Sequence, residues 1–242
     1  MIKYRTYRRS VNRFQRASPC RLWWVFMLVL IPVAAAAHDI SGDNARFVEG
    51  LDGPAVIPYM YLGAKHMVTG YDHLLYLVGV VFFLLHLKDV VLYVSLFTLG
   101  HSMTLLGGVL LEWSVNAYLI DTIIGLSVAY KAFENINGFK QVFGLQLNAR
   151  VAVLIFGFFH GLGLATKLQD LSLSADSLVM NMLSFNVGVE VGQVIALACI
   201  VLVLGQWRKS NHFRRQAFMA NTVLMSLGFM LAGYQFSAYL WA

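Results

Sequence analysis

Six apolar stretches, each about as long as a helix needs to cross a bilayer, dominate this sequence. They cover residues 68–87, 89–111, 115–135, 150–168, 178–206 and 217–241. A membrane-spanning helix needs about 20 mostly apolar residues, and the fifth stretch is long enough to tilt. Because 59% of the residues are hydrophobic and only 12% are charged, a soluble domain is excluded. The sequence predicts an all-α integral membrane protein with six transmembrane helices in one bundle.

The first 37 residues have the layout of a secretory signal peptide. Seven of the 18 basic residues come before residue 22, and an apolar run at 22–31 and the small residues 34–37 follow them. We expect cleavage after Ala37, and an uncleaved membrane anchor is the alternative. The remaining chain holds 11 basic and 12 acidic residues, so the basic character belongs to the leader. Nucleic acid is therefore not expected as a partner.

Lysine and arginine gather in the loops on one side of the predicted bundle. The loops at 87–90, 136–149 and 207–216, with their flanks, hold eight of these residues. Such loops stay in the cytoplasm, and a cleaved signal places the mature N-terminus outside. We therefore predict a multi-pass protein of the bacterial inner membrane with both mature termini extracytoplasmic. Residues 38–67 form an extracytoplasmic segment whose apolar part is an interfacial or re-entrant lead-in to the domain at 68–242.

Ionisable and amide side chains lie inside the apolar stretches, where a charge costs about 2.5–3.5 kcal/mol on insertion scales. At about 1.5 Å of rise per residue, the outer half or the centre of the bundle holds His66, Asp72, His73, His101, Asp121, His160, Asn186 and Glu190. This common depth predicts one shared polar site. Cys20 belongs to the leader and Cys199 stands alone, so metal ligands must be nitrogen and oxygen atoms. The predicted metal ligands are His73, His101, His160 and Glu190. Additional or supporting residues are His66, Asp72, Ser102, Asp121, Asn186 and Gln193.

Helical spacing groups several of these residues. Asn186, Glu190 and Gln193 follow i, i+4 and i+7, which places them on one stripe of the fifth helix. Gly157 and Gly161 flank His160 and allow a neighbouring helix to approach closely. The pattern favours a polar interior that is reached from outside the cell.

Five motifs make the chain similar to the HupE/UreJ family of membrane proteins. They are GYDHLLYL at 70–77, FTLGHSMTL at 97–105, IDTIIGLS at 120–127, FGFFHGLGLA at 156–165 and FNVGVEVGQ at 185–193. The resemblance implies an accessory membrane protein, in some members a nickel or cobalt permease that serves hydrogenase or urease maturation. Asp121 stands where the family pattern leads us to expect glutamate, and the motifs resemble the broad, uncharacterised branch of the family.

Three functions remain open from the residues. The first is a permease or metal-binding accessory protein for a divalent ion such as nickel, cobalt or zinc, with the lipid bilayer and metalloenzyme maturation proteins as partners. The second is a metal-dependent intramembrane hydrolase, in which a zinc-like site activates water and Ser102 or Asp72 assists. The third is a structural assembly factor whose polar residues only join helices.

Overall fold

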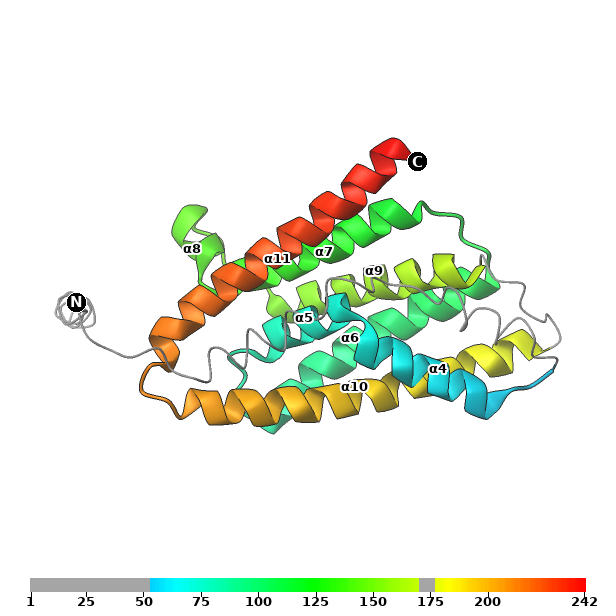
Figure 1. Cartoon of the computed structure of the whole chain (residues 1–242), viewed down its shortest axis with the longest axis horizontal. Coiled ribbons are helices and arrows are strands. Elements are labelled where there is room, and N and C mark those ends of the chain that lie inside the picture. The colour runs from blue at the N-terminus through cyan, green and yellow to red at the C-terminus, as the bar shows by residue number, and fades with distance from the viewer. Residues whose placement is uncertain (1–52, 170–176) are drawn as a thin grey trace. The chain divides into compact units, whose positions relative to one another are not determined.

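The structure, a computed structural model, describes residues 53–169 and 177–242, all within one compact unit at His38–Ala242. These residues form helices and no strand, so the predicted all-α class is confirmed (Figure 1). The predicted signal peptide, its cleavage point and residues 38–52 lie outside the described residues. The helices are α4 (Val56–Thr69), α5 (Tyr71–Val81), α6 (Leu87–Leu110), α7 (Ala117–Asn135), α8 (Gly138–Val142), α9 (Ala149–Gln169), α10 (Leu178–Arg208) and α11 (Phe213–Trp241).

Four helices in the described part of the chain are long and apolar enough to cross a membrane, namely α6, α9, α10 and α11. Their bounds lie within a few residues of the predicted second, fourth, fifth and sixth stretches. Helix α7 agrees with the predicted third stretch, but it carries three charged residues, Asp121, Lys131 and Glu134, and is not among the four. Helix α5 is apolar and has only 11 residues, which is too short to cross alone.

The predicted first stretch at 68–87 is not one helix, because the chain breaks at Gly70. Helix α4 ends at Thr69 and α5 begins at Tyr71, while Gly70 has an extended backbone with φ −71° and ψ 99°. The Gly70 N–H donates to the carbonyl of His66 at 2.8 Å, and its carbonyl accepts from the Leu74 N–H at 3.0 Å. Gly70 therefore closes the end of one helix and opens the next.

The two short helices lie in succession along α10 and run in its direction. At the start, the Ala55 N–H donates to Oδ1 of Asn181 at 2.8 Å. At the end, the Arg208 guanidinium donates to the carbonyls of Val81, Phe82 and Leu84, the last at 2.8 Å. Helices α4 and α5 together thus extend over the same length as the 31-residue α10.

Glycine lets three pairs of helices approach closely. A Cβ atom added to Gly188 of α10 would overlap with the backbone of Met60 in α4, and one added to Gly161 of α9 would overlap with the carbonyl of His101 in α6. Gly125 of α7 faces the backbone of Ala232 in α11 in the same way. Small residues of this kind allow helices to pack closely in lipid, where dispersion contacts take the place of the hydrophobic effect in helix association.

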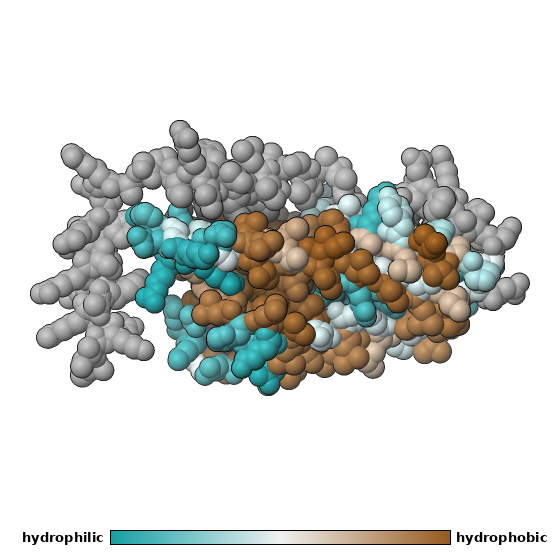
Figure 2. Space-filling model, turned by 90° about the horizontal axis from the view of Figure 1, so that it is seen from below, coloured by the Kyte–Doolittle hydropathy of each residue, from teal (hydrophilic) through white to brown (hydrophobic). Residues whose placement is uncertain are grey.

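The surface over α10 and α6 is apolar across its middle, as Figure 2 shows. Its exposed side chains include Leu99 and Met103 on α6 and Val187, Val194 and Leu202 on α10. Hydrophilic residues gather at the end where α10 turns into α11. This distribution fits a protein whose middle contacts lipid tails and whose polar end contacts water.

Replacing Arg208 by glutamine should lower the free energy of unfolding by about 2–3 kcal/mol, because a charged donor to helix-terminal carbonyls is lost. Thermal unfolding of the detergent-solubilised protein measures this. Arg214→Gln is the matched control, because Arg214 is exposed in the first turn of α11. Equal unfolding midpoints for the two variants would show that the Arg208 contacts do not stabilise the junction.

Candidate functional site

Four histidines from four helices meet at the break between α4 and α5. His73, in the first turn of α5, has its ring centroid 5.1 Å from that of His66 in α4, 5.9 Å from that of His101 in α6 and 5.0 Å from that of His160 in α9. The rings of His73, His101 and His160 are almost completely buried. Three of the four predicted ligands therefore lie together, and His66 joins them.

The break at Gly70 is what brings His66 and His73 together. In a continuous helix, residues seven apart are separated by about 10 Å along the axis. Their ring centroids are 5.1 Å apart here, because the chain changes direction between them. A helix interrupted within an apolar bundle leaves backbone groups of both halves near such a site.

Hydrogen bonds orient two of the rings. Nδ1 of His73 contacts Oδ1 of Asp72 at 2.9 Å, and Nδ1 of His160 contacts the carbonyl oxygen of Phe156 at 2.7 Å. Because a carboxylate and a carbonyl only accept, Nδ1 carries the proton in both rings and Nε2 keeps its lone pair in the neutral form. A metal-binding histidine is commonly held in this way by a carboxylate or a carbonyl.

Several buried nitrogen atoms here make no hydrogen bond within the described part of the chain. They include Nε2 of His73 and both ring nitrogens of His101. A buried polar atom left without a partner costs about 1–3 kcal/mol. Buried polar atoms of this kind are commonly satisfied by a bound water molecule or ion.

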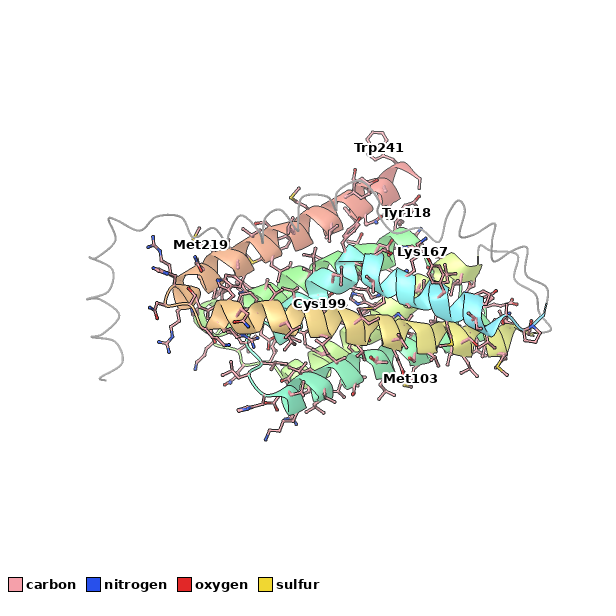
Figure 3. All side chains as sticks on the ribbon, turned by 60° about the horizontal axis from the view of Figure 1, so that its bottom comes forward. Met103, Tyr118, Lys167, Cys199, Met219 and Trp241 are labelled. Atoms are coloured by element: carbon pink, nitrogen blue, oxygen red, sulfur yellow. The ribbon has the colours of Figure 1, made fainter. Side chains whose placement is uncertain are left out.

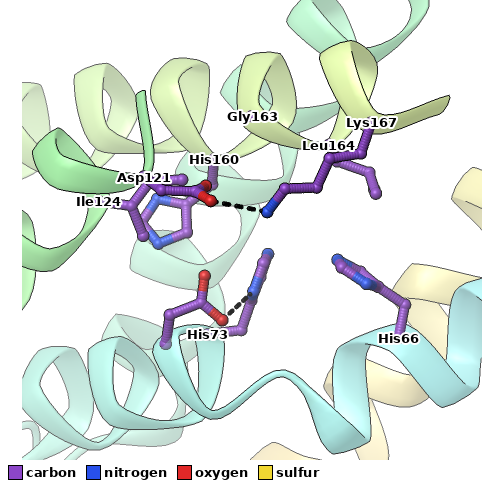
Figure 4. Close-up of a pocket in the computed structure, with 9 residues that line it drawn as sticks. His66, His73, Asp121, Ile124, His160, Gly163, Leu164 and Lys167 are labelled. Atoms are coloured by element: carbon purple, nitrogen blue, oxygen red, sulfur yellow. Dashed lines mark hydrogen bonds and ion pairs between the residues drawn. The ribbon is translucent and has the colours of Figure 1, made fainter. Parts of the chain in front are cut away.

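A small cavity of about 10 Å³ lies beside these rings, which is about the space that one water molecule needs. Its polar lining consists of His66, Asp72, His73, Asp121, His160 and Lys167 (Figure 4). Nζ of Lys167 in α9 is 2.8 Å from Oδ2 of Asp121 in α7. The predicted Asp121 thus belongs to the site, where it is paired with a lysine, and Asp72 holds the ring of His73.

The family model described as HupE / UreJ protein matches residues 43–242. The chain belongs to this family. No curated protein and no solved structure matches it. The match covers every described helix, so the histidine cluster lies within the part of the chain that the family model covers.

In this HupE/UreJ protein the predicted Ser102, Asn186 and Gln193 join helices instead of lining the cavity. Oγ of Ser102 in α6 donates to Oδ1 of Asn186 in α10 at 3.4 Å. Oγ1 of Thr98, one turn earlier in α6, donates to Oε1 of Gln193 at 2.9 Å. These two pairs connect α6 and α10, and they show that the two helices run in opposite directions.

Glu190 lies apart from the histidine cluster of this HupE/UreJ protein. Its side chain is exposed and is not among the residues that line the cavity. Helix α10 packs with α4 and α6 through the side that buries Asn186, Val189 and Gln193. Residue 190 is turned by about 100° from Val189, toward the exposed Val187 and Val194. The predicted stripe is therefore split at this residue.

Two residues of the site were not predicted. Lys167 follows His160 by seven residues, so the same helical spacing that grouped the other residues placed it on the face of His160. Tyr76 is 1% exposed, and its ring centroid lies 5.2 Å from that of His160. It follows His73 by one helical turn, but a tyrosine in an apolar stretch carries no signal that separates it from a packing residue.

As positioned, no three histidine, cysteine, aspartate or glutamate side chains of residues 53–169 and 177–242 could hold a metal ion together. The distances from the ring of His73 to its three neighbours are nevertheless close to the distance between two such ligands. Two imidazoles that share a tetrahedral zinc ion have centroids about 5 Å apart, and His73 lies 5.0–5.9 Å from its three neighbours.

Proposed function

We propose that this protein is a membrane permease or metal-binding accessory protein for a divalent transition-metal ion, with nickel and cobalt as the first candidates. The observation that carries the proposal is the arrangement of three histidine rings around the central His73 in a buried site. Imidazole nitrogen suits nickel, cobalt and zinc. Membership in the HupE/UreJ family, some members of which are nickel or cobalt permeases, supports the choice of cargo.

The donors of the proposed site are His66, His73, His101 and His160, with Asp72 and Asp121 beside them. Asp72 fixes the proton of His73 on Nδ1, which leaves Nε2 for the metal ion. Glu190 is left outside the proposed donor set because it is exposed.

The proposed membrane topology counts α4 and α5 together as the first of six crossings. A broken helix is tolerated at membrane depth where protein surrounds it. Helix α4 packs on α10, α5 packs on α7, and both ends of the α4–α5 segment are hydrogen-bonded to α10. The arginines and lysines near the turn from α10 to α11 then lie in the cytoplasm. His101, nine residues before Leu110, is about 14 Å from the outer end of α6. This orientation supports a site reached from outside in the inner membrane, with both mature termini extracytoplasmic.

Polar groups continue from the histidine cluster toward the proposed cytoplasmic side. Tyr76 follows His73 by one turn, and the carbonyl of Gly79, a further turn on, accepts from Nδ2 of Asn135 at 2.8 Å. The same Nδ2 donates to Oδ1 of the fully buried Asn221 at 2.8 Å. These groups lie among α5, α7 and α11 and support passage of a cation inward over binding at an outer site alone.

The site gives little support to the hydrolase alternative. Ser102 hydrogen-bonds to Asn186 and does not line the cavity. The cavity of about 10 Å³ suits a water molecule or an ion.

The test is metal binding and uptake by the purified full-length protein. After treatment with a chelator, the detergent-solubilised protein is titrated with Ni²⁺, Co²⁺ and Zn²⁺, and liposomes that contain it are assayed for uptake of each ion. We expect one bound ion per protein molecule, and uptake into these liposomes above that of empty liposomes. Binding without uptake would favour the accessory role, whereas no binding and no uptake of any of the three ions would refute the proposal.

The variant Glu190→Gln separates the two possible donor sets in the same titration. We expect it to bind metal as the wild type does, because the Glu190 side chain is exposed outside the cluster. A clear loss of metal affinity would show that Glu190 is one of the metal ligands.

A further inference from the structure

A lysine occupies the place in this site where a cation would be attracted. Nζ of Lys167 lies 2.8 Å from Oδ2 of Asp121, and both residues line the cavity with His73 and His160. In Figure 4 the Lys167 side chain extends along the cavity toward Asp121, above the ring of His73. The Asp121 side chain is 9% exposed and that of Lys167 is 21% exposed, so the pair is largely removed from water.

The charges of the cavity are balanced differently with and without this lysine. Its ionisable lining consists of Asp72, Asp121 and Lys167, together with histidines that are neutral when they bind a metal. With the ammonium in place, the lining has a net charge of −1. When Lys167 points away, the net charge is −2, which matches a divalent cation.

The backbone that carries Lys167 is anchored, while its side chain is 21% exposed. Leu168 is completely buried, and Nε2 of Gln169 donates to the carbonyl of Gly108 at 2.6 Å. The last turn of α9 is therefore anchored by the two residues that follow the lysine. Figure 3 shows Lys167 close to the beginning of α7, where Tyr118 lies. Four methylene groups and a partly exposed head allow the ammonium to swing out to water without helix movement.

We propose that Lys167 is a tethered cation that competes with the metal ion for Asp121 and so sets both the access to the site and its affinity. With no metal bound, its ammonium neutralises Asp121. When a divalent cation enters, repulsion at a few ångströms in a medium of low polarity drives the ammonium out, and Asp121 faces the metal ion instead. When the ion leaves, Lys167 returns. This inference rests on the proposed function, because it requires that the site binds a divalent cation.

The first test compares the Ni²⁺ and Co²⁺ affinities of purified variants of the full chain. Lys167→Gln should bind at least roughly tenfold tighter than the wild type, since one positive charge is removed from the site. Lys167→Arg, which keeps the charge, should stay close to the wild type. Lys140→Gln removes the same charge from an exposed residue of α8 and should change nothing. Adding Asp121→Asn to Lys167→Gln should take away the gain.

The outcomes distinguish this inference from the proposed function. If the wild type binds metal and a folded Lys167→Gln variant binds no tighter, the inference is wrong and the proposed function stands. If neither protein binds Ni²⁺, Co²⁺ or Zn²⁺, both are wrong. If the pair only holds α7 to α9, Lys167→Gln will lower the unfolding temperature without raising the affinity.

A second measurement uses the wild-type protein, so that it does not depend on how the variant folds. An amine-reactive reagent is applied with and without saturating Ni²⁺, and modification of each lysine is quantified by mass spectrometry. Lys167 should be modified several-fold faster with metal, because its ammonium has moved to water, while Lys140 should not change. Equal rates at Lys167 in the two conditions would overturn the inference.

Discussion

Replacing His73 by alanine should weaken metal binding by at least about a hundredfold. That is the upper end of the loss in affinity when only the hydrogen-bond partner of a metal ligand is removed, and here a proposed ligand itself is lost. His73 is the one ring within 5.9 Å of all three other histidine rings, so its removal takes a donor from the centre of the site. It also leaves Asp72 without the ring that it orients. Titration of the purified, chelator-treated protein with Ni²⁺ and Co²⁺ measures the effect.

Two further variants define what the His73 result means. His86→Ala removes an exposed histidine at the start of α6 and should bind metal as the wild type does. Asp72→Asn keeps the shape of the side chain and should lower the metal affinity by about 10–100-fold, because the hydrogen bond that orients His73 is weakened. If His73→Ala lowers the unfolding temperature and metal binding is absent throughout, the polar residues act only in assembly of the bundle.

Replacing Gly188 by alanine should destabilise the protein by about 3 kcal/mol, the upper end of the usual cost of overpacking. The added Cβ atom would overlap with the carbonyl of Met60 in α4, and a backbone atom cannot turn aside as a flexible side chain can. Helix α4 must therefore move away from α10. Because α4 carries His66, metal affinity should fall together with the unfolding midpoint.

Gly205 in the same helix is the matched control for Gly188. A Cβ atom at Gly205 would meet nothing within 4 Å, and alanine is favoured over glycine inside a helix by about 1 kcal/mol. Gly205→Ala should therefore leave the unfolding midpoint unchanged or raise it. If both variants unfold at the same temperature, close contact between α4 and α10 does not hold the bundle together.

The sequence predicts where helices lie better than it predicts where one is interrupted. Apolar composition continues through residues 54–87 without a charged cluster, so the sequence predicts the first crossing at 68–87. In the structure α4 ends at Thr69 and α5 ends at Val81. A break at a single glycine depends on what the two halves pack against. That information lies in distant parts of the chain, at Asn181 and Arg208.

The site could be predicted in part for a related reason. A histidine inside an apolar helix signals a polar interior whichever neighbours it has, and His73, His101 and His160 do lie together. Glu190 gives the same signal, but its direction depends on which side of α10 faces α4 and α6, and one sequence does not contain that. Lys167 was visible only as a residue near the end of a helix, although its spacing from His160 matched the site.

The interruption at Gly70 also divides the site between two helices, α4 and α5, that pack against different neighbours. Helix α4 is held mainly by α10, while α5 is held mainly by α7. His66 therefore moves with the α4–α10 pair, and His73 moves with the α5–α7 pair together with Asp72. A change in the angle at Gly70 alters the distance between His66 and His73 and leaves the bond between His73 and Asp72 intact. Movement of the α4–α10 pair against the α5–α7 pair would thus change the spacing of two of the proposed metal donors.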